Sequence, residues 1–452
     1  MNQRETFRSR MGFLLLSAGC AIGIGNVWRF PYVVGQNGGG VFVLFYLLFL
    51  AIMGVPVLSM EFAVGRASRK SPVKAYQALE KPGSKWHLHG YAAMAGNYML
   101  MMFYTTVAGW MVYYFYSFLI GRFSKMPSEE VAGVFGEMLA SPAINVFWMV
   151  AVVVIGILIC SMGLQKGVER ITKVMMIGLL SLMIVMAVRG LTLDGGMEGL
   201  AFYLKPDFGK MAEVGVGNVI VAAMNQSFFT LSLGIGAMAI FGSYLEKENT
   251  LLGEAVNVAV LDTFVAITAG LIIFPACFAF GVNPDSGPSL IFITLPNVFV
   301  SMPGGRVWGS LFFLFMSFAA FSTVIAVFEN IIACGMELFH IERKRAAMIN
   351  LAALILLSLP CALGYNVFSA FEPMGAGSSV LDLEDFIVSN LLLPLGSLVY
   401  LLFSTWEFGW GMENYRREAN EGHGLLVPAW ICGYLKYILP LMILALFLQG
   451  IL

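Results

Sequence analysis

Apolar stretches long enough to cross a membrane follow one another along the whole chain, with only short polar segments between them. A helix needs about 20 apolar residues to span a bilayer core of about 30 Å. Eleven stretches reach this length, at roughly residues 11–30, 39–65, 90–121, 143–162, 167–189, 216–243, 253–280, 307–338, 345–364, 382–408 and 428–450. The pattern predicts an all-α integral membrane protein in which residues 1–452 form one membrane domain of eleven transmembrane helices.

Composition and charge placement agree with this topology. The chain is 59% hydrophobic and 12% charged, whereas soluble domains carry about 25% charged residues. With the N-terminus inside, 18 of the 26 Lys and Arg fall in cytoplasmic segments, six fall outside and two lie within spans. The positive-inside rule therefore predicts a cytoplasmic N-terminus and an external C-terminus. No basic patch suggests a nucleic-acid partner, and the compact loops favour a bacterial inner (plasma) membrane.

Residues 19–31, which read Gly-Cys-Ala-Ile-Gly-Ile-Gly-Asn-Val-Trp-Arg-Phe-Pro, place polar and flexible positions inside the first span. In hydrocarbon every backbone N–H and C=O needs a partner, so a loosened helix is tolerated only where its freed groups line a cavity or hold a ligand. Ionisable residues at this depth are costly and usually functional. The segment is therefore predicted to form one wall of a site for ions and a small solute.

The sixth apolar stretch is interrupted in a similar way by Phe-Phe-Thr-Leu-Ser-Leu-Gly-Ile-Gly at residues 228–236. The first and sixth stretches hold matching places in two halves of five, residues 11–189 and 216–408, with residues 428–450 outside them. An odd number of spans per half predicts an inverted repeat. Glycine-interrupted helices at matching positions indicate a transport site at mid-membrane.

The two breaks supply complementary chemistry. Helix N-termini favour a carboxylate, whereas freed carbonyl oxygens favour a small hard cation. A zwitterionic amino acid presents one group to each. Ser322 and Thr323 in the eighth stretch could complete an all-oxygen cation shell, or they could simply bond to the preceding helical turn and pack against a neighbour.

Several blocks together resemble the neurotransmitter:sodium symporters, especially the bacterial amino-acid transporters. The matching blocks are residues 23–32 (Gly-Ile-Gly-Asn-Val-Trp-Arg-Phe-Pro-Tyr), 37–40 (Asn-Gly-Gly-Gly), 54–56 (Gly-Val-Pro), 61–66 (Glu-Phe-Ala-Val-Gly-Arg), 202–208 and 228–236. The resemblance covers essentially the whole chain in order. The pairing of broken helices with a transport site is best known from this same family, so it adds no independent support.

The resemblance implies two sodium sites, with sodium as the coupling ion and no other cofactor. The first site would use the Ala21 carbonyl, the Asn26 side chain, Thr230 and Asp262, completed by the substrate carboxylate. The second would use the carbonyls of Gly19, Ile22 and Ala319 with the hydroxyls of Ser322 and Thr323. Because the carboxylate would touch one of the ions, substrate and sodium would raise each other's affinity.

The implied substrate pocket is mostly apolar and carries no charge. Its residues would be Cys20, Ala21, Ile24, Gly25, Leu100, Tyr104, Phe229, Thr230, Ser232, Ile235, Thr323 and Val327. Such a pocket offers no counter-charge to a charged side chain. A neutral, apolar or aromatic L-amino acid is therefore predicted, with a small osmolyte or γ-amino acid as the alternative.

Two positions refine the predicted substrate and the predicted ion dependence. Monoamine-transporting relatives carry an aspartate where this chain has Gly23, so glycine here implies a substrate that brings its own carboxylate. Chloride-dependent relatives carry an asparagine at the position of Asp262 and a serine at that of Ala266. A fixed carboxylate beside sodium can replace the charge of chloride, so chloride independence is predicted.

The resemblance also implies gates on both sides of the site. Arg29 and Asp385 would pair in the outer vestibule above Tyr104 and Phe229, and Arg4 with Glu337, helped by Ser243 and Tyr244, would close the inner one. Exposed ion pairs are worth only about 0–1 kcal/mol, so they can break during a cycle. Two further acids in apolar surroundings, Glu61 and Glu329, are left without an assigned role.

Two departures from the family pattern stand out. The commoner form has a twelfth helix that is missing here, so dimer contacts and the oligomeric state cannot be inferred. A proline that many relatives carry in the fifth span is Ile177 in this chain. Proline loosens a helix, so loosening near the second sodium site would have to rely on a residue such as Gly178.

Other functions fit less well. Residues 234–239 match a dinucleotide fingerprint formally but lie inside a span without a preceding strand. The histidines, at 87, 89, 340 and 423, lack metal spacing, so an enzyme is not expected. A channel would need a continuous polar path, and a sensor would bind an amino acid without accumulating it; flux measurements separate these from a symporter.

Overall fold

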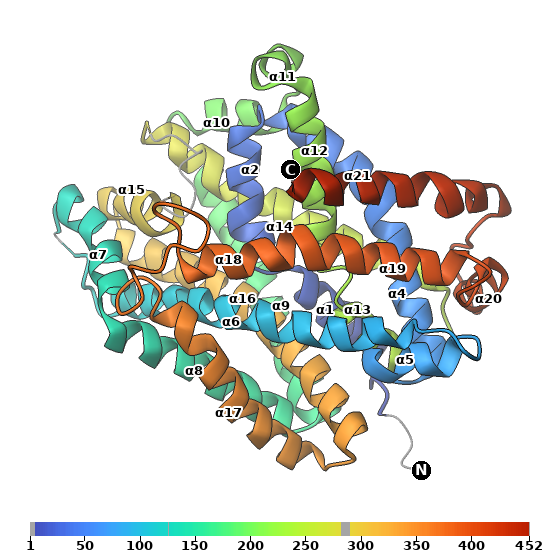
Figure 1. The fold of residues 1–452 in the computed structure, drawn as a ribbon. Coiled ribbons are helices and arrows are strands. Elements are labelled where there is room, and N and C mark those ends of the chain that lie inside the picture. Colours follow the sequence, from blue (N-terminus) through green and yellow to red (C-terminus); the bar gives the residue numbers. More distant parts are fainter. Residues whose placement is uncertain (1–4, 125, 282–289, 452) are drawn as a thin grey trace.

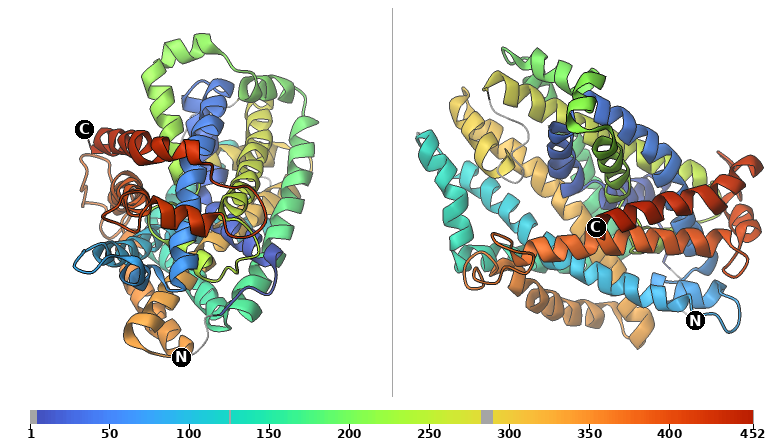
Figure 2. Two further views of the ribbon diagram at one scale, coloured as in Figure 1. Left: turned by 90° about the vertical axis from the view of Figure 1, so that its right-hand side faces the viewer. Right: turned by 45° about the horizontal axis from the view of Figure 1, so that its top comes forward.

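The computed structural model of the chain describes residues 5–124, 126–281 and 290–451 and is built of helices. Within these residues the only β-type pairing is an isolated bridge between Asn249 and His423. Figures 1 and 2 show long helices packed side by side in one bundle. In Figure 1 the short helices α7 (Ser128–Ala140) and α15 (Leu295–Ser301) lie at one end of the bundle, and α5 (Pro72–Leu79) and α20 (Met412–Ala419) lie at the other.

Eight helices of the described chain are long and apolar enough to cross a membrane. They are Gly40–Ser68 (α3, a π-helical turn and α4), Pro142–Ser161 (α8), Leu164–Leu191 (a π-helical turn and α9), Leu251–Ala279 (α14), Gly305–Phe339 (α16), Arg343–Ala362 (α17), Val380–Thr405 (α18, a π-helical turn and α19) and Ala429–Ile451 (ending in α21). The pair Arg10–Ala21 (α1) and Gly25–Gln36 (ending in α2) makes a ninth if counted as one span.

Two predicted spans are not among these nine candidates. The stretch 90–121 coincides with the continuous helix α6 (His87–Leu119), and 216–243 coincides with α12 (Val216–Phe229) and α13 (Ala237–Ser243). The all-helical membrane architecture is therefore present, whereas the count of eleven spans and the inverted repeat remain predictions. The short helices α10 (Gly196–Leu204) and α11 (Phe208–Val214) lie together at the top of Figure 1.

Both predicted helix breaks are present. The chain bends by 54° between α1 and the segment that begins at Gly25, and Ile22 between them is extended. Between α12 and α13, residues 230–236 are not helical, and Ser232, Gly234 and Gly236 all have positive φ. A Cβ on Gly234 would lie 2.3 Å from the Leu393 carbonyl oxygen, so only glycine lets the unwound chain approach α19 this closely.

The core is centred on α16, which packs along α6 and also contacts α1, α8 and α9. Glycines allow several of these close approaches. A Cβ on Gly19 of α1, for example, would lie 3.2 Å from the Ser322 Cβ on α16. The two broken segments are therefore held against α16 and α14 at mid-length, where buried polar side chains gather.

Candidate ion and solute site

The first oxygen-rich cluster joins the break after α1, the break after α12 and α14. Asn26 Nδ2 donates to Asp262 Oδ1 at 2.8 Å, and Thr230 Oγ1 donates to Asp262 Oδ2 at 2.8 Å. All three side chains are fully buried, and Asn26 Oδ1 has no hydrogen-bond partner. A buried carboxylate beside an unpartnered amide oxygen suits a small cation, because sodium-like ions take oxygen ligands and an orphaned buried acceptor is costly.

Tyr46 on α3 was missed by sequence reasoning. Its side chain is fully buried and its hydroxyl lies beside Asp262 and Thr230. Its position in a span with aromatic neighbours gave no local signal, because a tyrosine in such a segment usually serves as packing or as an interface residue.

The second oxygen cluster lies between α1 and α16. Ser322 Oγ donates to the Ile22 carbonyl at 3.0 Å and to the Ala319 carbonyl at 2.8 Å, and Thr323 Oγ1 lies 3.4 Å from the Gly19 carbonyl. The five predicted oxygens of the second sodium site therefore converge across one helix contact. The Ser322 hydroxyl bonds both to its own preceding turn and across to α1, as the packing interpretation expects, and the cation shell stays a prediction.

Between the two clusters lies a small cavity of about 20 Å³. It is lined by Ala21, Gly23, Gly25, Leu100, Tyr104, Phe229, Ser232, Thr323 and Leu393. Space of this size holds about one water molecule, so the pocket is contracted and must widen to hold an organic solute. The other predicted pocket residues, Cys20, Ile24, Thr230, Ile235 and Val327, are buried nearby but do not line this cavity.

Tyr104 and Leu393 contribute different groups to the wall of the cavity. The Tyr104 hydroxyl accepts a hydrogen bond from the Ile24 N–H at 2.9 Å, which places a phenol beside the freed backbone of the first break. Leu393 on α19 was not predicted as a pocket residue. It comes from a helix remote in sequence, and an isolated leucine in an apolar span gives no sign that it faces a cavity.

Arg29 packs on Phe229, one of the residues that line the cavity. The Arg29 guanidinium carbon lies 4.0 Å from the centroid of the Phe229 ring. Arg29 Nη1 donates to Ser389 Oγ at 3.3 Å, and Ser389 Oγ donates to Asp385 Oδ1 at 2.7 Å. The expected direct Arg29–Asp385 contact is therefore replaced by a bridge through Ser389. Ser389 lies one helical turn after Asp385 and can bond back to it, which leaves its oxygen facing Arg29.

Replacing Arg29 with alanine is expected to impair transport more than binding. The half-buried side chain makes one aromatic contact with Phe229 and one 3.3 Å hydrogen bond, a small set of contacts whose loss should change ground-state affinity little. We expect about ten-fold slower uptake with substrate affinity within about three-fold of wild type. Parallel uptake and equilibrium-binding measurements check this. Equal losses of both would show that Arg29 is structural.

The predicted inner closure is only partly described, because Arg4 lies outside the described residues. Glu337 on α16 accepts hydrogen bonds from the Ser71 N–H at 2.9 Å and the Ser71 hydroxyl at 2.7 Å. The Tyr244 hydroxyl donates to Glu329 Oε1 at 2.8 Å, and Arg343 Nη1 lies 2.6 Å from Glu329 Oε2. Glu329, whose role sequence reasoning left open, is thus the buried partner of Arg343 and Tyr244.

Glu61 also acquires a role. It is fully buried on α4 and accepts a hydrogen bond from the Gly234 N–H in the second break. Unwinding a helix leaves backbone donors without partners. Glu61 satisfies one of them, so it supports the unwound segment.

Two buried oxygen clusters and a small cavity, built around broken helices in an apolar bundle, are the arrangement expected of an ion-binding membrane transporter. The chain belongs to the sodium:neurotransmitter symporter family, whose model matches residues 4–128 and 137–452. It is therefore a sodium-dependent symporter and a multi-pass membrane protein, and its family is one of transporters and not of enzymes.

Known relatives cover nearly the whole chain. The sodium-dependent transporter YhdH of Bacillus subtilis is 34% identical over 98% of this chain and 96% of its own length. A sodium-dependent transporter of Haemophilus influenzae is 32% identical over 99% and 98%, respectively. The crystal structure of MhsT in complex with L-phenylalanine superposes with a TM-score of 0.88 at 38% identity, covering 99% of this chain and 100% of MhsT.

Proposed function

We propose that the protein carries a neutral, hydrophobic or aromatic L-amino acid into the cell with sodium, without a need for chloride. The observation that carries this is the space at Gly23. A Cβ there would lie 2.3 Å from the Tyr104 hydroxyl and 2.5 Å from Thr323 Oγ1. Glycine leaves this space without a protein carboxylate and so close to two hydroxyls that an added side chain would crowd them, so a carboxylate bound between the ion clusters would come from the substrate.

The walls of the cavity support an uncharged side chain. Leu100, Phe229 and Leu393 are apolar, and Ser232 contributes only a hydroxyl. A charged substrate side chain would be desolvated here without a partner, at a cost of several kcal/mol. The solved relative MhsT was crystallised with L-phenylalanine, an amino acid of the class we propose.

For the ions, we propose that Ala21, Asn26, Thr230 and Asp262 hold one sodium, and that Gly19, Ile22, Ala319, Ser322 and Thr323 hold the other. The unpartnered oxygen of Asn26 supports the first assignment. The Asp262 carboxylate supplies the negative charge that would otherwise call for an anion, while Ala266 offers no hydroxyl to hold one. This pair of residues supports chloride independence.

Transport then proceeds by alternating access. The two repeats, residues 11–189 and 216–408, carry one broken helix each. The unit made of the first, second, sixth and seventh spans rocks against the rest, so that the site opens alternately to the two sides of a bacterial inner membrane. A cavity of about 20 Å³, with Arg29 packed on its lining residue Phe229, is too small for the substrate and fits a stage of the cycle in which the site is not loaded.

Uptake into proteoliposomes tests the proposal. With an inward sodium gradient and gluconate replacing chloride, labelled leucine, phenylalanine or tryptophan should accumulate above equilibrium, because sodium entry drives the substrate uphill. Matched vesicles with potassium in place of sodium serve as the control. Loss of uptake in gluconate would refute chloride independence. Downhill flux alone would indicate a channel, and binding without flux a sensor. Competition by an osmolyte or γ-amino acid in place of these amino acids would refute the substrate class.

A further inference from the structure

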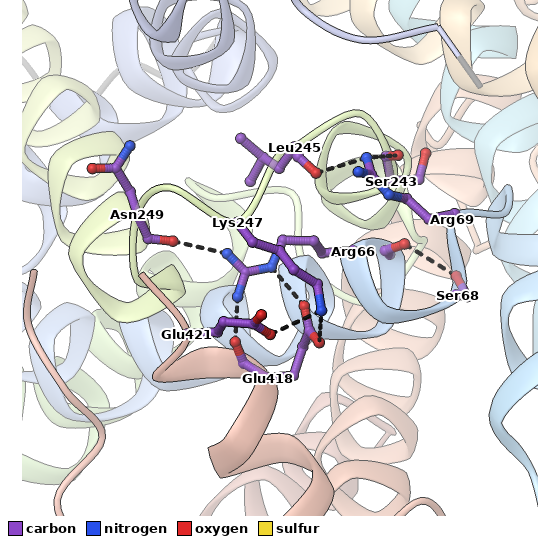
Figure 3. Close-up of polar contacts among 10 residues, drawn as sticks. Arg66, Ser68, Arg69, Ser243, Leu245, Lys247, Asn249, Glu418 and Glu421 are labelled. Carbon is purple, nitrogen blue, oxygen red and sulfur yellow. Dashed lines mark hydrogen bonds and ion pairs between the residues drawn. The ribbon is translucent and has the colours of Figure 1, made fainter. Parts of the chain in front are cut away.

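A further polar cluster, separate from the two oxygen clusters, lies near the end of α4. It is built around Arg66, whose side chain is fully buried and which Figure 3 shows between α4, the chain after α13, and α20. Arg66 Nε donates to Glu418 Oε1 at 2.6 Å, and Nη1 donates to the Asn249 carbonyl at 2.8 Å. Nη2 donates to the Glu418 carbonyl. A buried guanidinium with every nitrogen bonded fixes its partners in one arrangement, because each lost bond leaves a desolvated charge.

The local sequence explains how Arg66 reaches so far. Its neighbour Gly65 lets α13 pack directly on α4, since a Cβ there would lie 1.9 Å from the Ala239 carbonyl oxygen. Gly242 allows the same approach from the other side, with Phe62. Because α13 lies this close to α4, the Arg66 side chain extends past the end of α13 and contacts the loop that follows α13.

Residues 243–249, which are the last residue of α13 and the loop after it, are held by hydrogen bonds to their backbone carbonyls. Arg69 Nη1 donates to the Leu245 carbonyl at 2.8 Å and lies 3.4 Å from that of Ser243. Together with the Asn249 carbonyl, bound by Arg66, three carbonyls at and beyond the C-terminal end of α13 face guanidinium groups (Figure 3). Cations suit this end of a helix because its last carbonyls carry partial negative charge.

The segment after α20 completes the clamp. The His423 N–H donates to the Glu248 carbonyl at 2.8 Å, and the Thr250 N–H donates to the His423 carbonyl at 3.2 Å. Gly422 permits this backbone pairing, since a Cβ there would lie 2.7 Å from the Asn249 backbone. Lys247 also pairs with Glu421 at 2.8 Å, but both side chains are about half exposed, so this pair adds little to the clamp. Their hydrogen bond raises the pKa of Lys247 and lowers that of Glu421.

The clamped loop contains Tyr244, the residue that donates a hydrogen bond to Glu329 on α16. We propose that Arg66 is a positioning residue of the inner gate. Held by Glu418, it fixes residues 243–249 and so keeps Tyr244 against Glu329, and α20 travels with α4 and α13 when the gate moves. This proposal rests on the gating part of the proposed function, but it concerns residues that touch neither sodium nor substrate.

A native cysteine can report on the gate. Cys160 is buried at the end of α8, its carbonyl accepts from Arg343 Nη1 at 3.2 Å, and its thiol faces the Ile325 carbonyl on α16. Arg343 also holds Glu329, so release of Tyr244 should loosen the cover over Cys160. Its alkylation by N-ethylmaleimide, read by peptide mass spectrometry, measures opening without transport or substrate. Failure of this test is therefore distinguishable from failure of the uptake test.

We expect Glu418→Gln and Arg66→Gln to speed alkylation of Cys160 by about five-fold or more, since losing one buried contact shifts a closed–open equilibrium by at least that factor. Glu421→Gln is the matched control. It removes the same charge one turn away from an exposed pair and should stay within about two-fold of wild type. Arg66→Lys keeps the charge but cannot reach Glu418 and Asn249 together, so an intermediate rate is expected.

Measuring the alkylation rates of all six cysteines distinguishes opening of the gate from global unfolding. A gate effect raises the rate at Cys160 while Cys277 and Cys361, both buried elsewhere, keep theirs. If Glu418→Gln and Glu421→Gln give the same rate, or if every buried cysteine is accelerated alike, Arg66 is not a positioning residue of the gate and the proposal is overturned.

Discussion

Replacing Asp262 with alanine is expected to abolish sodium-dependent binding of substrate. The change removes the Asp262 carboxylate, which accepts hydrogen bonds from Thr230 Oγ1 and Asn26 Nδ2, and leaves Asn26 Nδ2 only the backbone carbonyl of residue 262 at 3.1 Å. Losing even a supporting group costs a metal site about 10- to 100-fold in affinity, so losing a direct anionic ligand should raise the sodium requirement at least about 100-fold. A sodium titration of labelled amino-acid binding measures this.

Replacing Asp262 with asparagine tests the contribution of the negative charge to sodium binding while it keeps the shape of the side chain. Asp262→Asn keeps one oxygen and should weaken sodium binding less than alanine does. Asp207 provides a matched control, because it caps α11 by accepting from the Gly209 and Lys210 N–H groups, a role that asparagine also fills. Asp207→Asn should therefore bind sodium like wild type. An unchanged sodium requirement in Asp262→Ala would remove Asp262 from the ion site.

The two helix breaks could be predicted because glycine, asparagine and hydroxyl residues inside apolar stretches contradict the ordinary demands of a membrane helix. Both breaks are present, and Asn26, Thr230 and Asp262 do meet. Ser389 could not be predicted in its bridging role, because its position between Arg29 and Asp385 depends on the rotation of the helix that carries it. Leu393 likewise reaches the cavity only through the tertiary approach of α19 to Gly234.

The number of membrane spans was predicted less well than the helix breaks. Hydrophobic stretches located the helices, yet α6 and the α12–α13 pair fall outside the nine candidates of the described chain. These segments carry the polar and aromatic groups of the site, such as Tyr104 on α6 and Thr230 after α12. The residues that serve the site thus either make a helix less apolar or, at 230–236, divide it into two segments too short to count as a span.

The roles of buried acids were also beyond sequence reasoning. Glu61 and Glu329 stand in equally apolar stretches, but one accepts from an unwound backbone and the other pairs with an arginine. The distinction depends on partners 173 positions away for Glu61 and 14 positions away for Glu329. Their shared environment could indicate that each needs a partner, but not which one.

Replacing Gly23 with aspartate is expected to abolish binding of amino acids while leaving the protein folded. The new Cβ would lie 2.3 Å from the Tyr104 hydroxyl, and its carboxylate would enter the space proposed for the substrate carboxylate. Two carboxylates sharing one site repel each other, so binding should fall by at least about 100-fold, with Gly23→Ala losing less because it adds bulk without charge.

Gly133 on α7 provides the control for this substitution, since a Cβ there meets nothing within 4 Å. Gly133→Asp should bind like wild type, which separates a local effect from a general one. The decarboxylated amine of the preferred substrate gives the sharper comparison. Wild type should bind it far more weakly than the amino acid, because the amine leaves the ions and the Ile24–Tyr104 pair without a carboxylate. Equal affinity for the two would show that Gly23 does not reserve its space for that group.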